Sequence, residues 1–445
     1  MRVLLLAHVF PPHPEVGALR AAGLLAAFRD AGHQVTLVTE PLPGKVPRIP
    51  PGSGPDVRVI SVEPGLPYTA RLGRALQRLR LIRAAPPSGA GALGTPDGAP
   101  SPGPLRRLLR AVLGIPDDAN YCIAPFARAG QAALREGADL IYSSAPPFSL
   151  HLSARRLRRR SGIPWVAEFR DPWVHPASTR PPARHPLTSG IDRFLERRVL
   201  ASADAIVMAT ESAKEHVAHR LPASKRGRVL VARNGIPDWG EPPPLQEGST
   251  PFRIVHTGTL YQDRNPAGFF AALAQYVRHS GITPSRLQIE MIGRQYQGTS
   301  VAALVERMGV REFVQFEDWL PHEQVRERLF QANALLLFAQ GQPLQVPNKL
   351  YEYLAVRRPI LAFVDQHGES ARILERFPES RLFFGAEPEP VVAVLRELLE
   401  RPLTGRPAPA PTAMESLSTR VQLGQLVAEL ERRFGKAQRS DSARA

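Results

Sequence analysis

The feature that most constrains the fold is a repeated alternation of short apolar runs with segments of helical spacing. Residues 2–10 form a continuous apolar run, residues 18–32 space their apolar side chains at helical intervals, and residues 33–40 form a second apolar run. Continuous apolar runs are typical of strands that a parallel sheet buries on both faces, and a strand–helix–strand unit connects parallel strands. The sequence therefore predicts an α/β protein built from parallel sheets.

Length and linkers divide the chain into two such domains. With 445 residues the chain exceeds what one core usually holds, and the alternation stops at a proline-rich stretch, residues 237–251, and then resumes. We expect an N-terminal Rossmann-like domain over residues 1–238 and a second Rossmann-like domain over residues 251–402, with a cleft between them. Residues 413–437, which follow a second proline-rich linker, have helical spacing, and we expect this C-terminal helix to pack back on the N-terminal domain.

A basic insertion interrupts the N-terminal domain at about residues 64–118. It contains two segments with leucines on one side of a helix and arginines on another, and the whole chain carries a formal net charge of +16. Such a surplus attracts anions, so nucleic acid, an anionic membrane surface and phosphorylated substrates are candidate partners. Two ordinary surface helices with solvated arginines explain the insertion equally well.

Several common active-site motifs are missing from the sequence. After the first predicted strand there is no G-x-G-x-x-G, only Gly17 and Gly23, and a P-loop lysine, H-E-x-x-H and G-x-S-x-G are also missing. The single cysteine, Cys122, excludes an intramolecular disulfide and a thiolate metal cluster, which fits a reducing compartment. Because no apolar run of about 18 residues is present, we expect no membrane-spanning helix.

Two loops that follow strands in the second half carry residues suited to a phosphate. In the first, Gly258 permits close approach of a ligand to the backbone, and Arg264 supplies a cation nearby. In the second, Pro347 ends the loop, Asn348 can cap the following helix, and Lys349 adds a positive charge at the helix start. The free amide groups of a helix start favour an anion.

Glu352 lies one turn inside that second helix. At this position its carboxylate can accept hydrogen bonds from vicinal hydroxyls of a ribose. A capping-box-like carboxylate, or a surface salt bridge with Arg357 or Arg358, explains the glutamate equally well.

Motifs along nearly the full chain resemble the retaining family-four glycosyltransferases, in particular a bacterial subgroup. The matching stretches are residues 1–39, DLIYSSAPPFSLHLSARRLRRRSGIPWVAEFRDPW (139–173), ERRVLASADAIVMATES (196–212), ARNGIPD (232–238), VHTGTLY (255–261) and VPNKLYEYLAVRRPIL (346–361). The resemblance implies a GT-B fold, in which two doubly wound Rossmann-like domains face each other across a cleft.

The resemblance also implies roles for individual residues. It implies that Glu352 binds the ribose of a nucleotide sugar, that Lys349 and Arg264 hold its diphosphate, and that Asp171 contacts the sugar or the acceptor hydroxyl, so these four are the expected catalytic residues. The expected nucleotide-binding residues are Gly17, Gly258, Thr259, Gly293, Arg294, Asn348, Leu350 and Tyr351, the last three through the helix start. The expected acceptor-side residues are Arg20, Arg170 and Trp173.

The chain departs from the family pattern at three places. The family often carries a glutamate eight residues before the ribose-binding one, where this chain has Leu344. Thr259 stands where many members carry arginine, and Val16 precedes Gly17 where the family has a second glycine. These departures bear on how the transferred sugar is held and on the role of Gly17.

The expected function is transfer of a sugar from a nucleotide-diphosphate donor to an acceptor hydroxyl with retention, without a metal or other cofactor. The expected acceptor is a carbohydrate or lipid-linked molecule of cell-surface polysaccharide or glycolipid synthesis, and the expected location is the cytoplasm, peripheral at the inner face of the cell membrane. Three alternatives stay open: a nucleotide-sugar epimerase of the same fold, a basic nucleic-acid-binding protein and an inactive binding or scaffold member. Nucleic acid is the weaker partner because the arginines show no interleaved aromatic stacking pattern.

Overall fold

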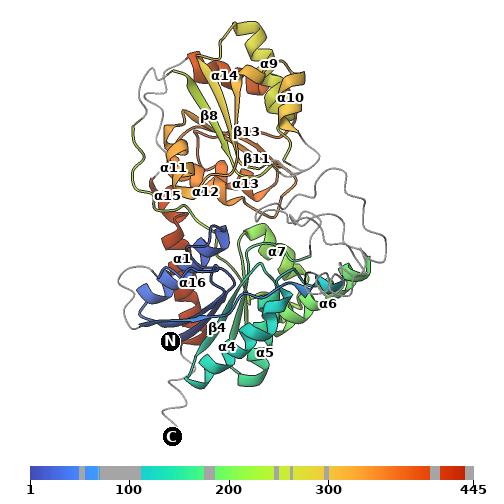
Figure 1. The fold of residues 1–445 in the computed structure, drawn as a ribbon, viewed down its shortest axis with the longest axis vertical. Coiled ribbons are helices and arrows are strands. Elements are labelled where there is room, and N and C mark those ends of the chain that lie inside the picture. Colours follow the sequence, from blue (N-terminus) through green and yellow to red (C-terminus); the bar gives the residue numbers. More distant parts are fainter. Residues whose placement is uncertain are drawn as a thin grey trace. The chain divides into compact units, whose positions relative to one another are not determined.

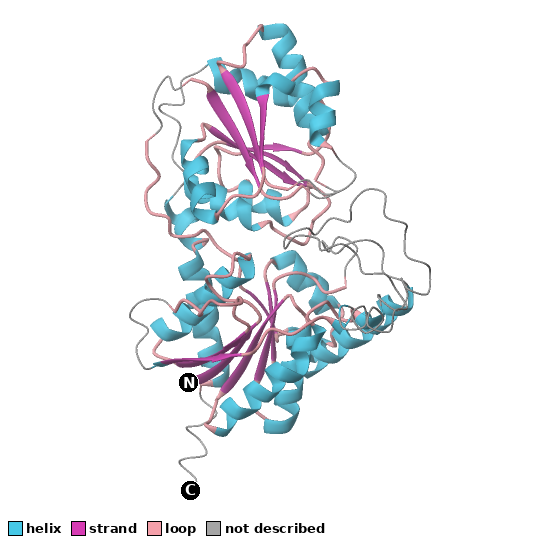
Figure 2. Cartoon of the chain, viewed as in Figure 1, coloured by secondary structure: helices cyan, strands magenta, loops and turns pink. Residues whose placement is uncertain are grey.

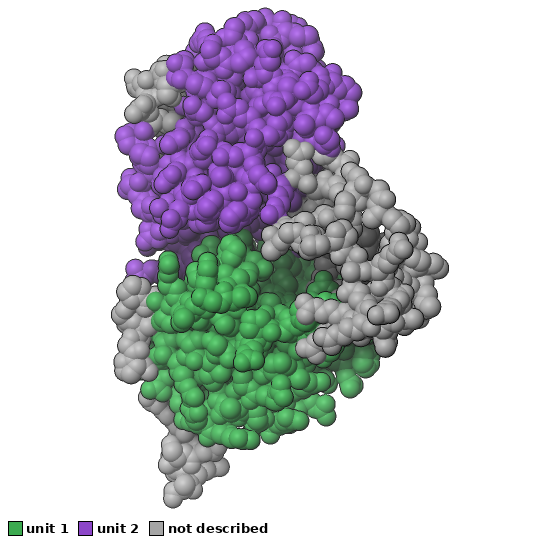
Figure 3. Space-filling model, viewed as in Figure 1, with its two compact units in different colours: residues 1–233, 422–445 green, residues 234–421 purple. Residues whose placement is uncertain are grey.

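The computed structural model of the chain describes residues 1–49, 56–68, 70, 112–174, 186–244, 250–260, 264–294, 300–400 and 411–435. The chain forms two compact units: unit 1 comprises residues 1–233 and 422–445, and unit 2 comprises residues 234–421 (Figures 1 and 3). Most of the predicted basic insertion lies outside the described residues, and so do residues 401–410 of the second predicted linker, 401–413. The remaining linker residues, 411–413, lie in a helix.

Unit 1 is built on a seven-stranded parallel sheet with the order β3-β2-β1-β4-β5-β6-β7. The strands are β1 Arg2–Ala7, β2 Gln34–Thr39, β3 Val57–Ser61, β4 Leu140–Ala145, β5 Trp165–Phe169, β6 Ala205–Met208 and β7 Val229–Val231. Strand order runs outward in both directions from the neighbours β1 and β4, which is the pattern of a doubly wound sheet.

Helices cover both faces of this sheet (Figure 2). They are α1 Val16–Asp30, η2 Asn120–Cys122, α4 Ile123–Arg135, α5 Ser149–Ser161, α6 Pro186–Ser202, α7 Glu211–His219, α8 Ala223–Arg226 and α16 Thr419–Phe434. Leu24 and Phe28 of α1 share one buried cluster with Leu5 of β1 and with Leu426 and Leu430 of α16. The C-terminal helix therefore contributes apolar side chains to the core of unit 1.

Unit 2 contains a six-stranded parallel sheet with the order β10-β9-β8-β11-β12-β13. The strands are β8 Phe252–Thr257, β9 Leu287–Ile292, β10 Val314–Glu317, β11 Ala334–Ala339, β12 Ile360–Val364 and β13 Arg381–Phe383. The helices are α9 Ala267–Ser280, α10 Val301–Arg307, η3 Arg311–Phe313, α11 His322–Gln331, α12 Asn348–Val356, α13 Glu369–Leu374, α14 Pro388–Glu400 and α15 Pro411–Ser416. With this second sheet, the predicted pair of parallel-sheet α/β domains is confirmed.

The central strand β11 shows why the apolar runs are continuous. Successive side chains of a strand point to opposite faces of the sheet. Leu336 and Phe338 pack in a cluster with α9 and α14, whereas Leu335 and Leu337 pack in a second cluster with α12 and α13. Because both faces are covered, every position of the strand is apolar and buried.

Candidate functional site

The predicted phosphate loops lie at the point of the unit 2 sheet where the strand order reverses. Strands β8 and β11 are hydrogen-bonded neighbours although two other strands separate them in sequence. In open α/β sheets the connections leave such a pair toward opposite faces, so the carboxyl ends of the two strands border a crevice in which ligands bind. The loop at Gly258 follows β8, and the loop that leads to α12 follows β11.

Two glycine backbones touch at this edge. Gly258 has φ +93°, and Gly293, which follows β9, has φ +128°. Residues with a side chain rarely adopt these conformations. A Cβ atom on Gly293 would lie 2.8 Å from both the carbonyl carbon and the carbonyl oxygen of Gly258. The Gly258 amide donates to the Ile292 carbonyl at 2.7 Å, so the two loops are locked together. A small hollow beside them is lined by His256, Gly258, Leu260, Met291, Ile292, Gly293 and Arg294.

Lys349 extends from α12 over the first of these glycines. A Cβ atom on Gly258 would lie 3.2 Å from its Nζ, so an added methyl group would meet the amine. The lysine side chain is buried, and this burial, together with the charge of Arg264, lowers its pKa well below the usual value, while Glu352 acts in the opposite direction. Lys349 and Gly258, predicted separately, are therefore brought together.

His256, the penultimate residue of β8, lies beneath this lysine. Its Nδ1 is 2.8 Å from the Leu336 carbonyl, which can only accept, so Nδ1 carries the proton. The other nitrogen, Nε2, then accepts from Lys349 Nζ at 3.4 Å. Burial and the nearby lysine charge lower the pKa of His256 well below its usual value, which keeps the ring neutral. Sequence reasoning missed this residue; the signal was a histidine inside an apolar strand, directly before a glycine loop.

Arg264 connects the loops that follow β8 and β11. Its guanidinium donates to the Thr259 carbonyl at 3.2 Å and to Gln342 Oε1 at 3.1 Å. The backbone amides of Gly341 and Gln342 in turn donate to the Asp365 carboxylate at 3.0 and 2.9 Å. Gln342 is a second residue that sequence reasoning missed, and it lies two positions before Leu344, where the family glutamate was sought.

The start of α12 differs from the expectation in two ways. Pro347 occupies the N-cap position, and Asn348 is the first helical residue, so Asn348 does not cap the helix. The Leu350 amide donates to the Pro347 carbonyl at 2.9 Å and is therefore already engaged within the helix. The side chains of Leu350 and Tyr351 are buried in the unit 2 core.

Glu352 meets neither of the arginines proposed for it as a salt-bridge partner. Arg357 pairs with Glu241 at 3.0 Å, and Arg358 donates to backbone carbonyls, so the surface salt-bridge explanation is wrong. Glu352 instead accepts from Asn348 Nδ2 at 2.8 Å and lies 3.3 Å from Nε2 of His322, the first residue of α11. Its carboxylate is thus oriented within unit 2, close to the start of α12.

Thr259 and Arg294 lie at the same edge of the unit 2 sheet, and their side chains differ in how freely they can move. The Thr259 carbonyl holds Arg264, as described above. Arg294 is about half exposed, and its guanidinium lies 4.0 Å from the Asp318 carboxylate. Of the two side chains, that of Arg294 is the one that can reach a ligand by changing rotamer.

In unit 1, the structure brings Gly17 and Arg170 together. A Cβ atom on Gly17, at the start of α1, would overlap the Arg170 guanidinium. That guanidinium donates to the carbonyls of Ala145 and Pro146, at the end of β4. Asp171 is the next residue and is partly buried. Gly17, Arg170 and Asp171 therefore occupy the carboxyl edge of the unit 1 sheet, on either side of its own point of strand reversal.

Arg20 and Trp173 are engaged inside unit 1. Arg20 is buried and forms an ion pair with Glu168 at 2.6 Å, and it also donates to two backbone carbonyls. Trp173 is 2% exposed, stacks on Phe148 with a centroid separation of 4.8 Å, and donates to Asp192 at 3.2 Å. An acceptor-side role for these two side chains does not follow from the structure, because burial directs both into the core.

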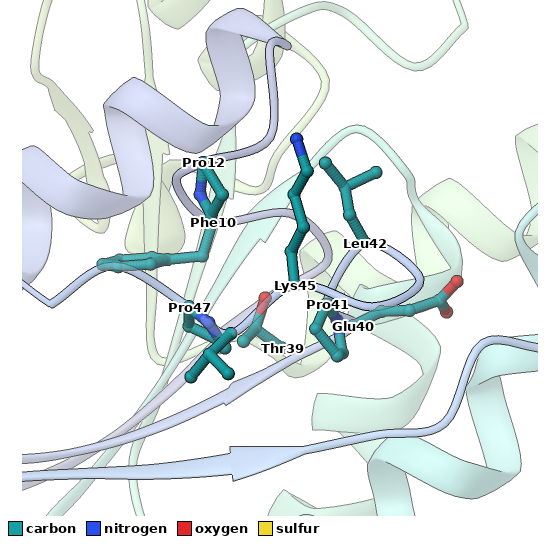
Figure 4. Close-up of a pocket in the computed structure, with 9 residues that line it drawn as sticks. Phe10, Pro12, Thr39, Glu40, Pro41, Leu42, Lys45 and Pro47 are labelled. Atoms are coloured by element: carbon teal, nitrogen blue, oxygen red, sulfur yellow. The ribbon is translucent and has the colours of Figure 1, made fainter.

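A further polar cluster lies at the same edge of unit 1. The Tyr121 hydroxyl donates to Glu40 at 2.8 Å, and His8 Nε2 lies 3.6 Å from the Glu40 carboxylate. His8 and Glu40 directly follow β1 and β2. Figure 4 shows the Glu40 carboxylate directed away from a neighbouring hollow, whose lining residues are Phe10, Pro12, Thr39, Glu40, Pro41, Leu42, Lys45, Val46 and Pro47. The three partners come from distant parts of the sequence, so spacing gave no signal for them.

The described residues contain neither a metal-binding cluster nor a helix able to span a membrane. Among them, no group of three or more histidine, cysteine, aspartate or glutamate side chains is arranged to hold a metal ion. None of the helices in the described part of the chain has both the length and the apolar character needed to cross a membrane.

A known protein family matches part of the chain, chiefly within unit 1. Residues 17–235 match the family model of the glycosyl transferase 4-like domain. No curated protein sequence matches the chain.

Several solved structures are similar to nearly the whole chain. The lipopolysaccharide outer core galactosyltransferase WaaB matches with a TM-score of 0.57 and 13% identity over 97% of this chain and 100% of that one. Sucrose-phosphate synthase from Thermosynechococcus elongatus matches with a TM-score of 0.61 and 16% identity over 98% and 100% of the two chains. HepE from Anabaena, in complex with UDP, matches with a TM-score of 0.55 and 14% identity over 96% and 99%. At these identities the likeness establishes the fold, which is GT-B, as predicted.

Proposed function

We propose that this protein is a retaining glycosyltransferase that transfers a sugar from a nucleotide-diphosphate donor to a hydroxyl group of an acceptor. The observation that carries the proposal is the gathering of Lys349, Arg264 and Glu352 around two touching glycine backbones, at the point of strand reversal in unit 2. The glycosyl transferase 4-like match over residues 17–235 supports the same reaction class.

The chemistry of transfer accounts for this combination of residues. As the bond from sugar to phosphate breaks, negative charge develops on the departing nucleoside diphosphate, and fixed cations in a dry site stabilise it. Lys349 and Arg264 supply those cations. The glycine backbones at positions 258 and 293 permit close approach of the phosphates, since neither carries a Cβ atom. Glu352 accepts hydrogen bonds from the ribose hydroxyls.

The donor site requires no metal ion in this proposal. Two cationic side chains take the position that a divalent ion occupies in metal-dependent phosphate sites. Retention is proposed from the family resemblance, and front-face departure and attack need no protein nucleophile, so none is assigned.

The acceptor is proposed to bind at the carboxyl edge of the unit 1 sheet. Asp171 and Arg170 supply a carboxylate and a guanidinium there, and the guanidinium lies against the backbone of Gly17. A carbohydrate or lipid-linked hydroxyl of cell-surface polysaccharide or glycolipid synthesis is the proposed acceptor. The likeness to a lipopolysaccharide galactosyltransferase agrees with it.

A peripheral position at the inner face of the cell membrane completes the proposal. On α6, Ile191 and Phe194 are 42% and 56% exposed, and the exposed arginines Arg193, Arg197 and Arg198 lie beside them. Exposed apolar side chains among arginines favour an anionic lipid surface.

A thermal-shift panel with UDP, GDP, ADP and CDP tests the donor site. We expect one nucleotide to raise the unfolding midpoint of the wild-type protein and to lose this effect in Glu352→Ala. Glu327→Ala, which removes an exposed glutamate of α11, is the matched control and should behave like the wild type. If no nucleotide raises the midpoint of the wild-type protein, the donor site is refuted.

Product analysis separates the proposal from its rivals. With the donor sugar that corresponds to the stabilising nucleotide, NMR of the product should show the anomeric configuration of the donor. An epimerase of the same fold would convert or release the sugar without any acceptor, and a scaffold protein would bind the nucleotide without turnover. Either result would replace the proposed activity.

A further inference from the structure

Two donors from different helices converge on one oxygen atom of Glu352. Asn348 Nδ2 lies 2.8 Å from Oε1 and comes from the preceding turn of α12. His322 Nε2 lies 3.3 Å from the same oxygen and comes from the first residue of α11, thirty positions away in sequence. Among the described residues, no hydrogen bond reaches the other oxygen, Oε2.

The surroundings of His322 keep its ring near Glu352. Trp239 meets the imidazole edge-on, with centroids 5.8 Å apart and an interplanar angle of 70°. Trp239 is itself placed by Phe330, at a centroid distance of 6.1 Å. The His322 side chain is about half exposed, so it borders solvent while Glu352 lies deeper, with a side chain that is 11% exposed.

We propose that His322 is a positioning residue for the donor nucleotide. Together with Asn348 it fixes Glu352 through Oε1, which leaves Oε2 to accept hydrogen bonds from the vicinal hydroxyls of the ribose. This inference rests on the proposed function, because it requires Glu352 to meet a ribose. A carboxylate that is already fixed loses less rotational freedom on binding, so preorganisation strengthens the complex.

The arrangement also makes donor binding depend on pH. The hydrogen bond to Glu352 raises the pKa of His322, and the glutamate charge adds to this effect; desolvation and Arg326 oppose it, and Glu323 supports it. An imidazolium makes a stronger, charge-assisted hydrogen bond to Glu352 than a neutral ring does. The contribution of His322 is therefore full below its pKa and declines as the pH rises through it.

Lys349 contributes a pH dependence of the same sign, so the two must be separated. Its lowered pKa means that the ammonium also loses its proton as the pH rises. A glutamine at position 322 can donate to Oε1 through its amide but does not titrate. The part of the pH dependence that disappears in His322→Gln belongs to His322. The part that remains belongs to Lys349 and to the terminal phosphate of the nucleotide, which also ionises in this range.

The test compares the wild type with His322→Ala, His322→Gln and the control His279→Ala, which removes an exposed histidine of α9. Calorimetric affinities are measured from pH 6 to pH 8.5 for the nucleoside diphosphate, among UDP, GDP, ADP and CDP, that stabilises the wild type most. Inorganic pyrophosphate, which has no ribose, is the second ligand. Thermal unfolding of each variant checks that the fold is intact.

We expect His322→Ala to weaken nucleotide binding by about tenfold, the usual effect of one charge-assisted hydrogen bond, and to leave pyrophosphate binding unchanged. His322→Gln should recover most of the affinity at pH 8.5 and show a shallower pH profile than the wild type. His279→Ala should match the wild type throughout.

Two results would overturn the inference while the proposed function stands. One is a His322→Ala variant with wild-type nucleotide affinity and pH profile, and the other is an equal loss of nucleotide and pyrophosphate binding. A wild-type protein that binds none of the four nucleotides contradicts the proposed function itself, so the two failures are distinguishable.

Discussion

Replacing Gly293 by alanine tests how the phosphate-binding edge of unit 2 is built. The backbone at this position has φ +128°, and holding a residue with a side chain in such a region costs about 1–3 kcal/mol. The new methyl group would also lie 2.8 Å from two backbone atoms of Gly258, and relief of such overpacking costs about another 1–3 kcal/mol. The sum, about 2–6 kcal/mol, is a large fraction of the stability of a typical domain.

The alanine at position 293 would displace the loop at Gly258, which belongs to the proposed donor site. Gly258 must move away from position 293, and its amide is bonded to Ile292 while Lys349 Nζ lies above it. We therefore expect Gly293→Ala to lose nucleotide affinity at temperatures at which the variant is still fully folded. The loss should exceed tenfold, because the phosphate contacts and the lysine shift together.

Gly281→Ala is the matched control for backbone strain. Gly281 ends α9 with φ +63°, and no atom lies within 4 Å of a Cβ built there, so alanine at this position costs only about 1 kcal/mol. Urea unfolding of unit 2 and calorimetric nucleotide binding should separate the two variants clearly. If Gly293→Ala matches Gly281→Ala in both measurements, the close approach of the two glycine loops has no role in stability or binding.

Three further predictions concern buried and strained charges. Arg357 ends α12 with φ +55°, so Arg357→Gly should stabilise the protein by about 1 kcal/mol in urea unfolding, since the exposed pair with Glu241 contributes little. Arg20→Met leaves Glu168 buried without its cation and should destabilise unit 1 by about 3–5 kcal/mol. The double variant with Glu168→Gln should regain much of this loss, and an unchanged urea midpoint in Arg20→Met would contradict the buried pair. Burial lowers the pKa of Lys349, and a bound diphosphate should raise it again. Calorimetry near pH 8 in buffers of different ionisation enthalpy should therefore detect proton uptake, which Lys349→Arg should reduce.

The fold could be predicted from the sequence because its signals are local. A strand buried on both faces needs apolar residues at every position, as β11 shows, and the helices between strands repeat their apolar side chains at their own period. The phosphate loops follow from the same alternation, because parallel strands end at one edge. The apolar pattern therefore predicts that Gly258 and Lys349 lie at the same edge of the sheet.

The partners of the site residues could not be predicted in this way. His322 lies on a different helix from Glu352, and Arg20 meets Glu168 across the core of unit 1, so only the folded chain defines these pairs. The family resemblance implied an acceptor-side role for Arg20. Spacing indicates which side chains share one face of a helix, but it does not show which face the fold buries.

In the loop that follows β11, the residue that contacts Arg264 is Gln342, two positions before Leu344, where the family often carries a glutamate. The Asp365 carboxylate accepts from the backbone amides of residues 341 and 342, and the Gln342 side chain accepts from Arg264. A neutral amide at this point orients the guanidinium without neutralising it, whereas a carboxylate would cancel part of its charge. Burial and, after it, the charge of Arg264 lower the pKa of Lys349 beside it. A bound diphosphate relieves the repulsion between Arg264 and Lys349. The close pair therefore disfavours the charged form of Lys349 in the free protein, and it favours binding of the nucleoside diphosphate that the proposed reaction releases.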